Sequence, residues 1–499
     1  MNHIDGNLSR REFVMRSAAS LPAISTLSAS ALESQDHHAN GPKQRPNIVL
    51  YIADQFRWDC VGAYGLNPMG ITPNIDSLAK RGVGFQNAIT NQPWCSPARA
   101  CLFTGQYANK NGVWRLGLGL RPGDNTLATA LRGNGYTTHY IGKWHLAPWD
   151  DNGSNDQAVR QNGEGGVGYV PPQYRGGFLD GWQASNAIEV TSHPYEGTIW
   201  DESGKPMHYD GIHRIDYLTQ LAVDYLRKPH EKPFLMVLSQ LEPHEQNDLN
   251  RCAPPKKYED KFTNPYVPND LRFFPGEWQT QLPNYYGDIK AIDDSVGTVL
   301  KTLAEQNLTD NTIVVMLSDH GNHFLTRAHA EWKCTPHESS IHIPLFIQGP
   351  GFNQARLVPE VVSLVDVAPT LLDAAGIEAP VSMQGKSFFP TLQSPAGREA
   401  WRDEAFVQVS CTAIGRAIRT KEWTYFALDP KGDGNKAASS STYEEYQMYN
   451  LAADPHQLVN LAGREETREK ATELRERLVA RIEEAGEATP SIAPSKFYP

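Results

Sequence analysis

The 499-residue sequence predicts an α/β fold, a doubly wound, mostly parallel β-sheet sandwiched by helices, followed by a smaller C-terminal α+β domain. Short runs of continuous apolar residues alternate with segments of helical periodicity, which is the pattern of a parallel sheet buried on both faces. After about residue 396 the pattern changes to short strands and one charged helix. The length suits two domains, because single cores stop growing at roughly 250–300 residues.

Each element of the main sheet follows from a local pattern. Four apolar runs rich in β-branched residues are predicted as buried strands, over residues 47–53, 233–241, 312–317 and 343–347. Helices are predicted between them over residues 74–81, 126–134, 217–227 and 289–306. Three of the strands run directly into polar residues. Ligands bind beyond the carboxyl ends of strands in open α/β sheets, so these polar residues are expected to converge.

Further patterns define the rest of the chain. Residues 150–181 are rich in Gly, Asn and Gln, which predicts a long surface excursion. Short antiparallel strands are predicted over residues 405–410, 416–419 and 422–428. A charged helix over residues 465–484 carries three apolar residues on one face, Leu474, Leu478 and Ile482. The predicted domains are a catalytic domain over residues 46–395 and the C-terminal α+β domain over residues 396–499.

The N-terminal residues predict export. Residues 9–15 resemble a twin-arginine signal, and Ala29-Ser30-Ala31 fits an A-x-A cleavage site. We expect residues 1–31 to be a twin-arginine-type signal peptide and residues 32–45 to be a polar linker. The twin-arginine export machinery is then a partner, and the mature protein is exported, periplasmic or secreted in a bacterium. The alternative is a disordered N-terminus in which two arginines adjoin by chance.

The composition argues against several classes of protein. The chain carries 46 basic and 57 acidic residues, a formal net charge of −11, which gives no general attraction for nucleic acid. No run approaches the roughly 18 apolar residues of a membrane span, so none is expected. The cysteines at positions 60, 95, 101, 252, 334 and 411 show no C-x-x-C spacing, which predicts no zinc or redox motif. A disulfide framework is not expected at this size, and a single disulfide is left open.

The decisive motif is C-x-P-x-R over residues 95–99, followed by Thr104-Gly105. Alone it is only moderately specific, and the alternative is a buried cysteine beside a helix start. Other motifs surround it in fixed order: T-P-N-I-D-x-L-A over residues 72–79, G-K-W-H-L over residues 142–146, S-D-H-G over residues 318–321, and Lys333. Together, from about residue 46 to 465, they resemble the type I, formylglycine-dependent sulfatases of the alkaline phosphatase-like superfamily.

The resemblance implies a sulfuric ester hydrolase in which a formylglycine-generating maturation enzyme converts Cys95 into formylglycine. Its hydrate would attack sulfur with one hydroxyl and release sulfate with the other, so two easier steps replace one. The implied metal ligands are Asp54, Gln55, the modified Cys95, Asp319 and His320. The metal would be calcium (Ca²⁺), with manganese (Mn²⁺) or magnesium (Mg²⁺) as alternatives. Gln55 and His320 depart from the commonest pattern, which has Asp and Asn there.

The resemblance also implies catalytic roles. Arg99 should pair with the hydrate and hold its turn, while Lys143 and Lys333 should bind sulfate oxygens. His145 is the expected base, and His244 the expected acid for the leaving oxygen, a role that Lys333 shares. A histidine taken alone is more often a surface or core residue, and the order of the motifs is what favours function here. The family's P-H-x-P motif is replaced by P-H-E-Q over residues 243–246. The family's substrate contacts at this segment are therefore less transferable to this chain.

Further residues are predicted to contact the substrate. Arg327 and His329 are predicted to bind substrate, with His323 and Trp332 also near the pocket mouth. Tryptophans 94, 144 and 149 would stack on the rings of a sulfated glycan, and the alternative is that they pack in the core. His342 is expected to be structural.

Two rival functions follow from the same residues. A phosphonate monoester or phosphodiester hydrolase of the same superfamily would also suit Gln55 and His320. A glycan-binding protein without activity is disfavoured, because Cys95, Arg99, Lys143, His145 and Lys333 are all present together.

Overall fold

The computed structural model describes residues 45–149, 166–327, 331–411 and 413–496. The predicted signal peptide and the linker up to residue 44 lie outside these residues, as does His329. None of the helices in the described ranges has the length and apolar character needed to cross a membrane.

A large sheet of ten strands forms the centre of the fold, in the order β10-β2-β9-β8-β1-β7-β3-β4-β5-β6. The strands are β1 (Asn47–Ala53), β2 (Val83–Ile89), β3 (Thr137–Lys143), β4 (Gly181–Ser185), β5 (Glu196–Asp201), β6 (Pro206–Asp210), β7 (Phe234–Ser239), β8 (Thr312–Ser318), β9 (Leu345–Gln348) and β10 (Arg356–Ser363). The central pairs are parallel, and β9, β5 and β6 add antiparallel pairs. The mostly parallel sheet is therefore confirmed.

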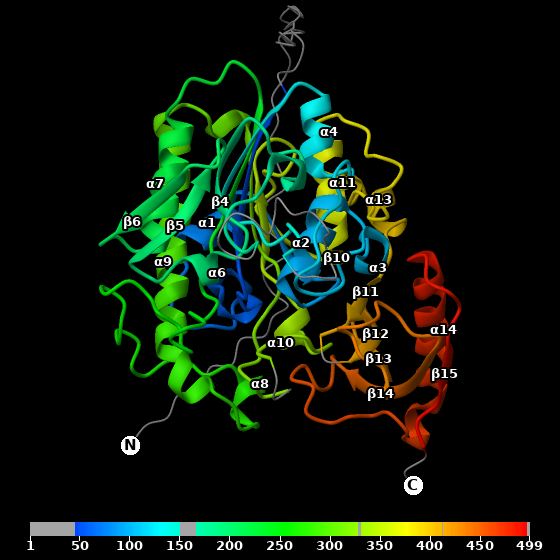
Figure 1. The fold of residues 1–499 in the computed structure, drawn as a ribbon. Coiled ribbons are helices and arrows are strands. Elements are labelled where there is room, and N and C mark those ends of the chain that lie inside the picture. The colour runs from blue at the N-terminus through cyan, green and yellow to red at the C-terminus, as the bar shows by residue number, and fades with distance from the viewer. Residues whose placement is uncertain (1–44, 150–165, 328–330, 412, 497–499) are drawn as a thin grey trace, which may run out of the picture. The chain divides into compact units, whose positions relative to one another are not determined.

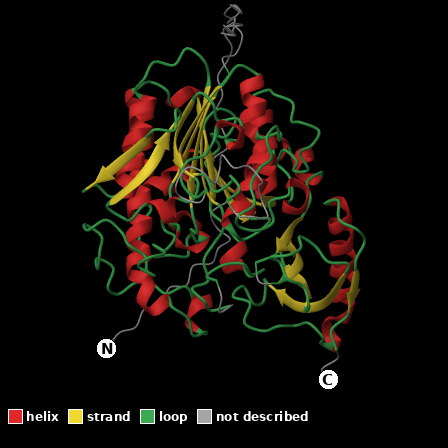
Figure 2. Cartoon of the chain, viewed as in Figure 1, coloured by secondary structure: helices red, strands yellow, loops and turns green. Residues whose placement is uncertain are grey.

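Helices cover both faces of this sheet (Figures 1 and 2). One face is covered by α1 (Pro73–Arg81), α7 (Arg214–Leu226) and α9 (Trp278–Glu305). The other is covered by α2 (Cys95–Thr104), α4 (Leu127–Gly133) and α11 (Val367–Ala374). Strand β1 serves both cores, since Ile48, Leu50 and Ile52 lie in one apolar cluster while Val49 and Tyr51 lie in the other. Period-two alternation between two buried faces explains why this strand is apolar throughout.

Short helices connect the larger elements. They are α3 (Ala108–Asn111), α6 (Ile188–Thr191), α8 (Asn269–Arg272), α10 (Glu338–Ile341), α12 (Phe389–Gln393) and α13 (Pro395–Glu399).

Two predictions for the main domain are only partly right. Helix α9 starts at Trp278 rather than at 289, although Pro283 removes one helical hydrogen bond. Leu282 and Tyr285 are buried on its first turns, and this packing outweighs that loss. The described part of the predicted surface excursion lies only partly on the surface, because Val170 and Phe178 are fully buried while Leu179 is 46% exposed. Six of the ten strands are not predicted from the sequence, since polar residues and glycines interrupt their apolar patterns.

A second sheet follows near the C-terminus, in the order β11-β12-β13-β14-β15. Its strands are β11 (Glu404–Val409), β12 (Ile414–Thr420), β13 (Trp423–Asp429), β14 (Thr442–Asn450) and β15 (Ser491–Ala493). The first three agree with the predicted strands, and all pairs are antiparallel except β14 with β15. Helix α14 (Arg468–Glu484) buries Leu474, Leu478 and Ile482 as expected. The described residues form one compact unit, and the domain boundary at residue 395 stays a prediction.

The sheet order explains why distant motifs meet. Strands β8, β1, β7 and β3 are consecutive neighbours and run parallel. Their carboxyl ends therefore lie along one edge, and each leads into a polar segment of the sequence. The predicted convergence of these polar residues at one edge is confirmed.

Candidate active site

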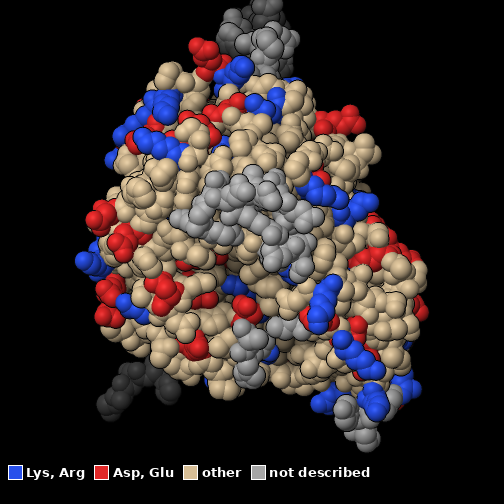
Figure 3. Space-filling view, in the orientation of Figure 1, with Lys and Arg blue, Asp and Glu red and all other residues tan. Residues whose placement is uncertain are grey.

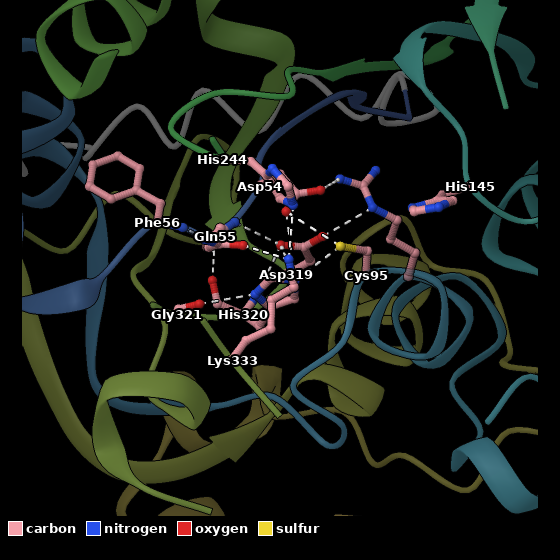
Figure 4. Close-up of polar contacts among 12 residues, drawn as sticks. Asp54, Gln55, Phe56, Cys95, His145, His244, Asp319, His320, Gly321 and Lys333 are labelled. Atoms are coloured by element: carbon pink, nitrogen blue, oxygen red, sulfur yellow. Dashed lines mark hydrogen bonds and ion pairs between the residues drawn. The ribbon is translucent and has the colours of Figure 1, made fainter. Parts of the chain in front are cut away.

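Four buried side chains meet where β1 and β8 end and α2 begins (Figure 4). They are Asp54, Cys95, Asp319 and His320, named here the Cys95 cluster, and their ligand atoms all lie within 4.8 Å of one another. Cys95 Sγ is 3.2 Å from His320 Nε2 and 3.6 Å from Asp54 Oδ1. The Cys95 side chain thus sits inside a set of potential metal ligands.

The donors of the Cys95 cluster fit a divalent cation. Two carboxylates and an imidazole, all fully buried, offer oxygen and nitrogen ligands of the kinds that calcium or manganese accepts. His320 Nδ1 lies 3.0 Å from the Gly321 carbonyl oxygen, which assigns the proton to Nδ1 and leaves Nε2 free to ligate. Burial lowers the pKa of His320, which favours this neutral form.

Gly321 is needed for this local geometry. A Cβ at this position would lie 2.2 Å from the Ser339 carbonyl oxygen of α10, closer than any real contact. Helix α10 therefore packs directly against the segment that carries His320.

Arg99 ties the two carboxylates together. It is fully buried and donates to Asp319 Oδ2 from Nε and to Asp54 Oδ2 from Nη2, both at 3.0 Å. Its Nη1 donates to the Lys143 carbonyl oxygen and to Ser239 Oγ. Its four hydrogen bonds fix the orientation of both acidic side chains before any metal binds. The structure therefore shows Arg99 holding both acidic side chains, and its expected role in holding its own turn stays a prediction.

One side of the Cys95 cluster is formed by Lys143, His145 and Glu189, named here the Lys143 flank. Lys143 Nζ lies 2.8 Å from Asp54 Oδ2 and 3.1 Å from Glu189 Oε1. His145 Nε2 lies 3.5 Å from the same Glu189 oxygen, and its ring stacks on Trp149 with centroids 4.8 Å apart. His145 Nδ1 has no hydrogen-bond partner among the described residues.

Electrostatics keep this flank ionised around a neutral histidine. Burial alone would raise the pKa of Glu189, but nearby positive charge, above all that of Lys143, lowers it to about 2. Burial also lowers the pKa of His145 well below its usual value, although Glu189 acts in the opposite direction. The result is a neutral imidazole with one free ring nitrogen beside a charged carboxylate.

The opposite side is formed by Lys333, His244, Glu245 and Gln55, named here the Lys333 flank. Lys333 Nζ lies 2.8 Å from His244 Nε2 and donates to Gln55 Oε1 at 2.7 Å. Gln55 Nε2 donates to Glu245 Oε2 at 2.9 Å. His244 Nδ1 lies 2.7 Å from the Glu245 carbonyl oxygen. Since a carbonyl only accepts, Nδ1 carries the proton and Nε2 accepts from Lys333.

Gln55 therefore has a different place from that expected of a metal ligand. Its side-chain oxygen accepts from Lys333, and its backbone N–H donates to Asp319 Oδ1 at 3.1 Å. Its φ of 64° lies in the left-handed region, which turns the chain away from Asp54 directly after β1.

Several residues expected near the substrate lie elsewhere. Trp144 is fully buried among Phe103, Tyr140, Phe178 and Trp182, so the prediction that it stacks on a sugar is wrong. Its indole N–H donates to the Tyr174 carbonyl oxygen at 3.0 Å, which holds the ring in this core.

Other predicted substrate residues have partners of their own. Arg327 donates to the carbonyl oxygens of His456 and Gln457, and its guanidinium stacks over Phe274. His323 is fully buried, and its Nε2 lies 3.0 Å from the Lys333 carbonyl oxygen. Neither residue contacts the Cys95 cluster through any side chain that the structure describes.

The remaining residues named from the sequence line the protein interior. Trp332 packs on Phe324, and Trp94 precedes Cys95 and is 7% exposed. His342 contacts Glu338 Oε2 at 2.9 Å and stacks on Trp58, which is a structural setting.

Two carboxylates of the site, Glu189 and Glu245, are not predicted from the sequence. Glu189 follows β4, a strand with no clear apolar pattern, so its position at the sheet edge is not visible in the sequence. Glu245 is visible beside His244, but it occupies a position where the family's pattern gives no fixed residue. The rule that polar residues follow the carboxyl ends of strands is the signal that could have found both.

Charge on the molecular surface is mixed. Figure 3 shows acidic and basic side chains interspersed across the face drawn there. The cations that could meet an anionic substrate, Arg99, Lys143 and Lys333, are instead buried in the site.

Comparison with known proteins identifies the family. Residues 46–377 match the Sulfatase family, and residues 332–484 match the family described as N-sulphoglucosamine sulphohydrolase, C-terminal. An ulvan-active sulfatase of Formosa agariphila is 29% identical over 492 residues, covering 95% of this chain and 89% of the relative.

Solved structures show the same fold. A sulfatase structure from work on the metabolism of multiple glycosaminoglycans by Bacteroides thetaiotaomicron has a TM-score of 0.75 at 22% identity, covering 89% of this chain and 97% of that one. The phosphonate monoester hydrolase of Agrobacterium radiobacter has a TM-score of 0.65 at 22% identity, covering 88% and 96%. With the family match spanning most of the chain, this protein belongs to the sulfatase family and is a sulfuric ester hydrolase.

Proposed function

We propose that this sulfatase removes sulfate from a sulfated carbohydrate, with Cys95 converted to formylglycine and a divalent cation bound beside it. The observation that carries the proposal is the position of Cys95 Sγ, 3.2 Å from His320 Nε2 and 3.6 Å from Asp54 Oδ1. The carbohydrate substrate is supported by the printed names of the ulvan-active relative and of the glycosaminoglycan-related structure.

The charge of the site supports a cation. Arg99, Lys143 and Lys333 supply three positive charges, whereas Asp54, Asp319, Glu189 and Glu245 supply four negative ones. Together these charges sum to −1, which would repel a sulfate ester. A divalent cation reverses that sign. We propose Asp54, Asp319, His320 and the converted Cys95 as its ligands, with Gln55 joining only if Lys333 releases its oxygen.

Calcium is the proposed metal, and manganese or magnesium are the alternatives, because oxygen donors predominate and one nitrogen is present. When bound, the metal would make an attacking hydroxyl more acidic and neutralise sulfate oxygens. Dialysis against a chelator should remove the metal, measured by elemental analysis, and should lower the melting temperature Tm as well as activity. Unchanged Tm and activity in metal-free protein would contradict the metal site.

The protein's own residues would divide the remaining work. Lys143 and Lys333 would bind the sulfuryl oxygens, and buried positive charge is worth more there than in water. His145, neutral and with a free Nδ1, would accept a proton. Lys333, which carries the proton shared with His244 Nε2, would protonate the leaving oxygen. Arg99 would keep the acidic side chains in place throughout.

Mass spectrometry tests the conversion of Cys95. The tryptic peptide that carries residue 95 should be about 18 Da lighter than the thiol form, since the aldehyde oxygen replaces sulfur. Cys95→Ala should abolish turnover while leaving folding nearly intact. A fully unmodified thiol in active enzyme would contradict the proposal.

The alternative function, a phosphonate monoester or phosphodiester hydrolase, is tested by comparing the turnover of two substrates by the wild-type protein. Family membership and the named sulfatase relatives favour sulfate esters, so turnover of an aryl sulfate should exceed that of an aryl phosphonate. The reverse order would favour the alternative. The signal peptide predicted over residues 1–31 lies outside the described residues, so export of the mature protein stays a prediction.

A further inference from the structure

Two cysteines that the proposed mechanism does not use lie beside each other. Cys334 and Cys411 are 77 positions apart in the sequence, yet their thiols are in hydrogen-bond contact. Cys334 directly follows Lys333, and Cys411 is the second residue after β11. Both thiols are free in the structure. The pair therefore brings the loop of the proposed acid against the end of a strand of the second sheet.

Backbone contacts also bring the two cysteines together. The segment that leads to Cys95 contacts both of them. The Cys334 N–H donates to the Pro93 carbonyl oxygen at 3.0 Å. The neighbouring Gln92 donates from Nε2 to Ser410 Oγ, in the residue directly before the second cysteine. The proximity of the two thiols thus rests on the backbone around them as well as on their side-chain orientations.

The end of β11 is firmly held where the second cysteine follows it. The Gln408 N–H donates to the Asn91 carbonyl oxygen at 2.7 Å, and Asn91 Nδ2 donates to the Phe406 carbonyl oxygen at 2.8 Å. A Cβ at Gly434 would lie 2.0 Å from the Ser410 carbonyl oxygen, so the chain packs closely there as well. A bond to this strand end would therefore join Cys334 to a fixed support.

The backbone of Cys334 is in a conformation that needs support. Its φ of 71° lies in the left-handed region, which residues other than glycine adopt rarely. Such conformations persist where the surrounding structure holds them, and they concentrate at functional sites. The hydrogen bond to Pro93 is one restraint, and a covalent bond to Cys411 would add a second. Because Lys333 is the preceding residue, both restraints would also limit its movement.

The remaining cysteines have different settings. Cys60 and Cys252 are at most 1% exposed, and their sulfurs contact oxygens of Asp59 and Pro243. Of the six cysteines, all of which the structure describes, Cys334 alone is partly exposed. Thiol exchange requires access to the sulfur. Cys334 is therefore the cysteine that an oxidant from solvent meets first.

We propose that Cys334 and Cys411 form a disulfide bond that ties the loop of Lys333 to the end of β11. The Cys334 thiolate would attack one sulfur of a small-molecule disulfide and release one thiol. The Cys411 thiolate would then attack the Cys334 sulfur of the mixed disulfide and release the second thiol. Two protons and two electrons thus pass from the protein to the oxidant, which becomes two thiols. The bond itself is independent of the proposed function, and only its formation in an oxidising compartment rests on the predicted export.

Peptide mapping of the full chain tests the bond. The oxidant is oxidised glutathione at about pH 8.5, because burial raises the pKa of Cys334 well above its usual value and alkaline solution provides more thiolate. Remaining thiols are alkylated, and the protein is digested with trypsin without reduction. The peptides that carry residues 334 and 411 should be joined, with a mass about 2 Da below the sum of the two thiol peptides.

The same mapping is repeated on protein refolded in the glutathione buffer, in case exchange within the native fold is slow. Joined peptides in either preparation support the proposal. Alkylation of both cysteines in both preparations, or a bond from either cysteine to another thiol in the folded protein, would overturn it.

Thermal unfolding with matched variants separates this bond from a general effect. Oxidised wild type should melt about 3–6 °C above reduced wild type, because closing a loop of about 77 residues restricts the unfolded chain. Cys60→Ala should keep this difference, and Cys411→Ala should lose it. Each variant is compared with its own reduced form, so a loss of stability from the substitution itself cancels. Cys411→Ser replaces Cys411→Ala if the latter does not fold, and equal Tm values for oxidised and reduced wild type would overturn the proposal.

Hydrogen exchange tests whether the bond holds the loop of Lys333. Backbone amides of residues 331–336 should exchange at least about threefold more slowly in the oxidised protein than in the reduced protein, because local opening is restricted. Equal exchange in the two forms would overturn the tie to this loop. Turnover of an aryl sulfate is measured in parallel, because its absence would contradict the proposed function without affecting the mapping of the disulfide.

Discussion

The two flanks of the Cys95 cluster contain the same kinds of residue in opposite arrangements. Each has one lysine, one histidine and one glutamate. On the Lys143 flank, the lysine contacts Asp54 and Glu189, while His145 keeps a free Nδ1. On the Lys333 flank, the lysine contacts the histidine directly, and Gln55 links it to Glu245.

This difference determines where protons reside. His145 is neutral with a free nitrogen, so the Lys143 flank is ready to accept a proton. Lys333 carries a proton that it shares with His244 Nε2, so the Lys333 flank is ready to give one. Burial lowers the pKa of Lys333, but nearby negative charges, those of Glu245 and Asp54 among them, raise it more, which keeps the amine protonated. The comparison predicts a base on one flank and an acid on the other.

The largest expected effect is that of Lys143→Ala. Lys143 Nζ contacts Asp54 and lies inside the fully buried site, so its charge should stabilise every sulfate ester alike. We expect kcat/KM to fall by roughly a hundredfold to a thousandfold, equally for aryl sulfates and sugar sulfates. This is the usual loss when a donor positioned at the charge of the transition state is removed. Steady-state kinetics with both substrates measure this. Lys301→Ala, which breaks an exposed pair with Glu305 on α9, is the control. A loss confined to one substrate would contradict the comparison.

Glu189→Gln should have the next largest effect, about tenfold to hundredfold on kcat, as for other residues that orient a catalytic partner. The loss arises because His145 is no longer held by a charged carboxylate. Glu189→Asp should recover part of the activity. An unchanged kcat for Glu189→Gln would show that His145 needs no orientation from this flank.

The same carboxylate affects stability at low pH. Its pKa falls from 4.5 in the unfolded chain to about 2 in the fold, so it stabilises the protein above pH 4.5. That contribution, up to about 3 kcal/mol, is lost as pH falls from about 4.5 to 2. Chemical denaturation at a series of pH values should show a shallower acid dependence in Glu189→Gln than in wild type. Equal slopes would contradict the low pKa.

Gln55→Asp should have the smallest effect, a severalfold change in calcium affinity, because ligand charge tunes calcium binding. The new carboxylate would lie beside Glu245, whose Oε2 is now 2.9 Å from Gln55 Nε2. Repulsion between the two should limit the gain, and Gln55→Asp with Glu245→Gln should bind calcium more tightly than Gln55→Asp alone. Calorimetry measures both. Equal affinities would show that Glu245 does not act on position 55.

Much of the fold and site follows from the sequence because the relevant signals are local. The apolar run of β1 and the polar residues that follow β1 and β8 are enough to predict that Asp54, Asp319 and His320 share one sheet edge. The fixed C-x-P-x-R spacing likewise predicts that Cys95 and Arg99 lie close together. Such patterns need no knowledge of tertiary contacts.

The remainder depends on contacts between distant segments. Glu189 follows a strand of only five residues, and its role arises from Lys143 and His145, 46 and 44 positions earlier. The burial of Trp144 likewise depends on Phe178 and Trp182, which come from a segment with weak apolar pattern. Direct contact between Lys333 and His244 also joins residues far apart in the chain.

The leaving-group dependence of Lys333→Ala tests the division between flanks most directly. Wild type, Lys143→Ala and Lys333→Ala are compared on an aryl sulfate and on a sulfated oligosaccharide. A phenol leaves with little protonation, whereas a sugar alcohol needs an acid. The account predicts that Lys333→Ala loses at least about tenfold more activity on the oligosaccharide than on the aryl sulfate, while Lys143→Ala loses equally on both. Equal losses for Lys333→Ala would contradict the account and assign Lys333 to sulfate binding alone.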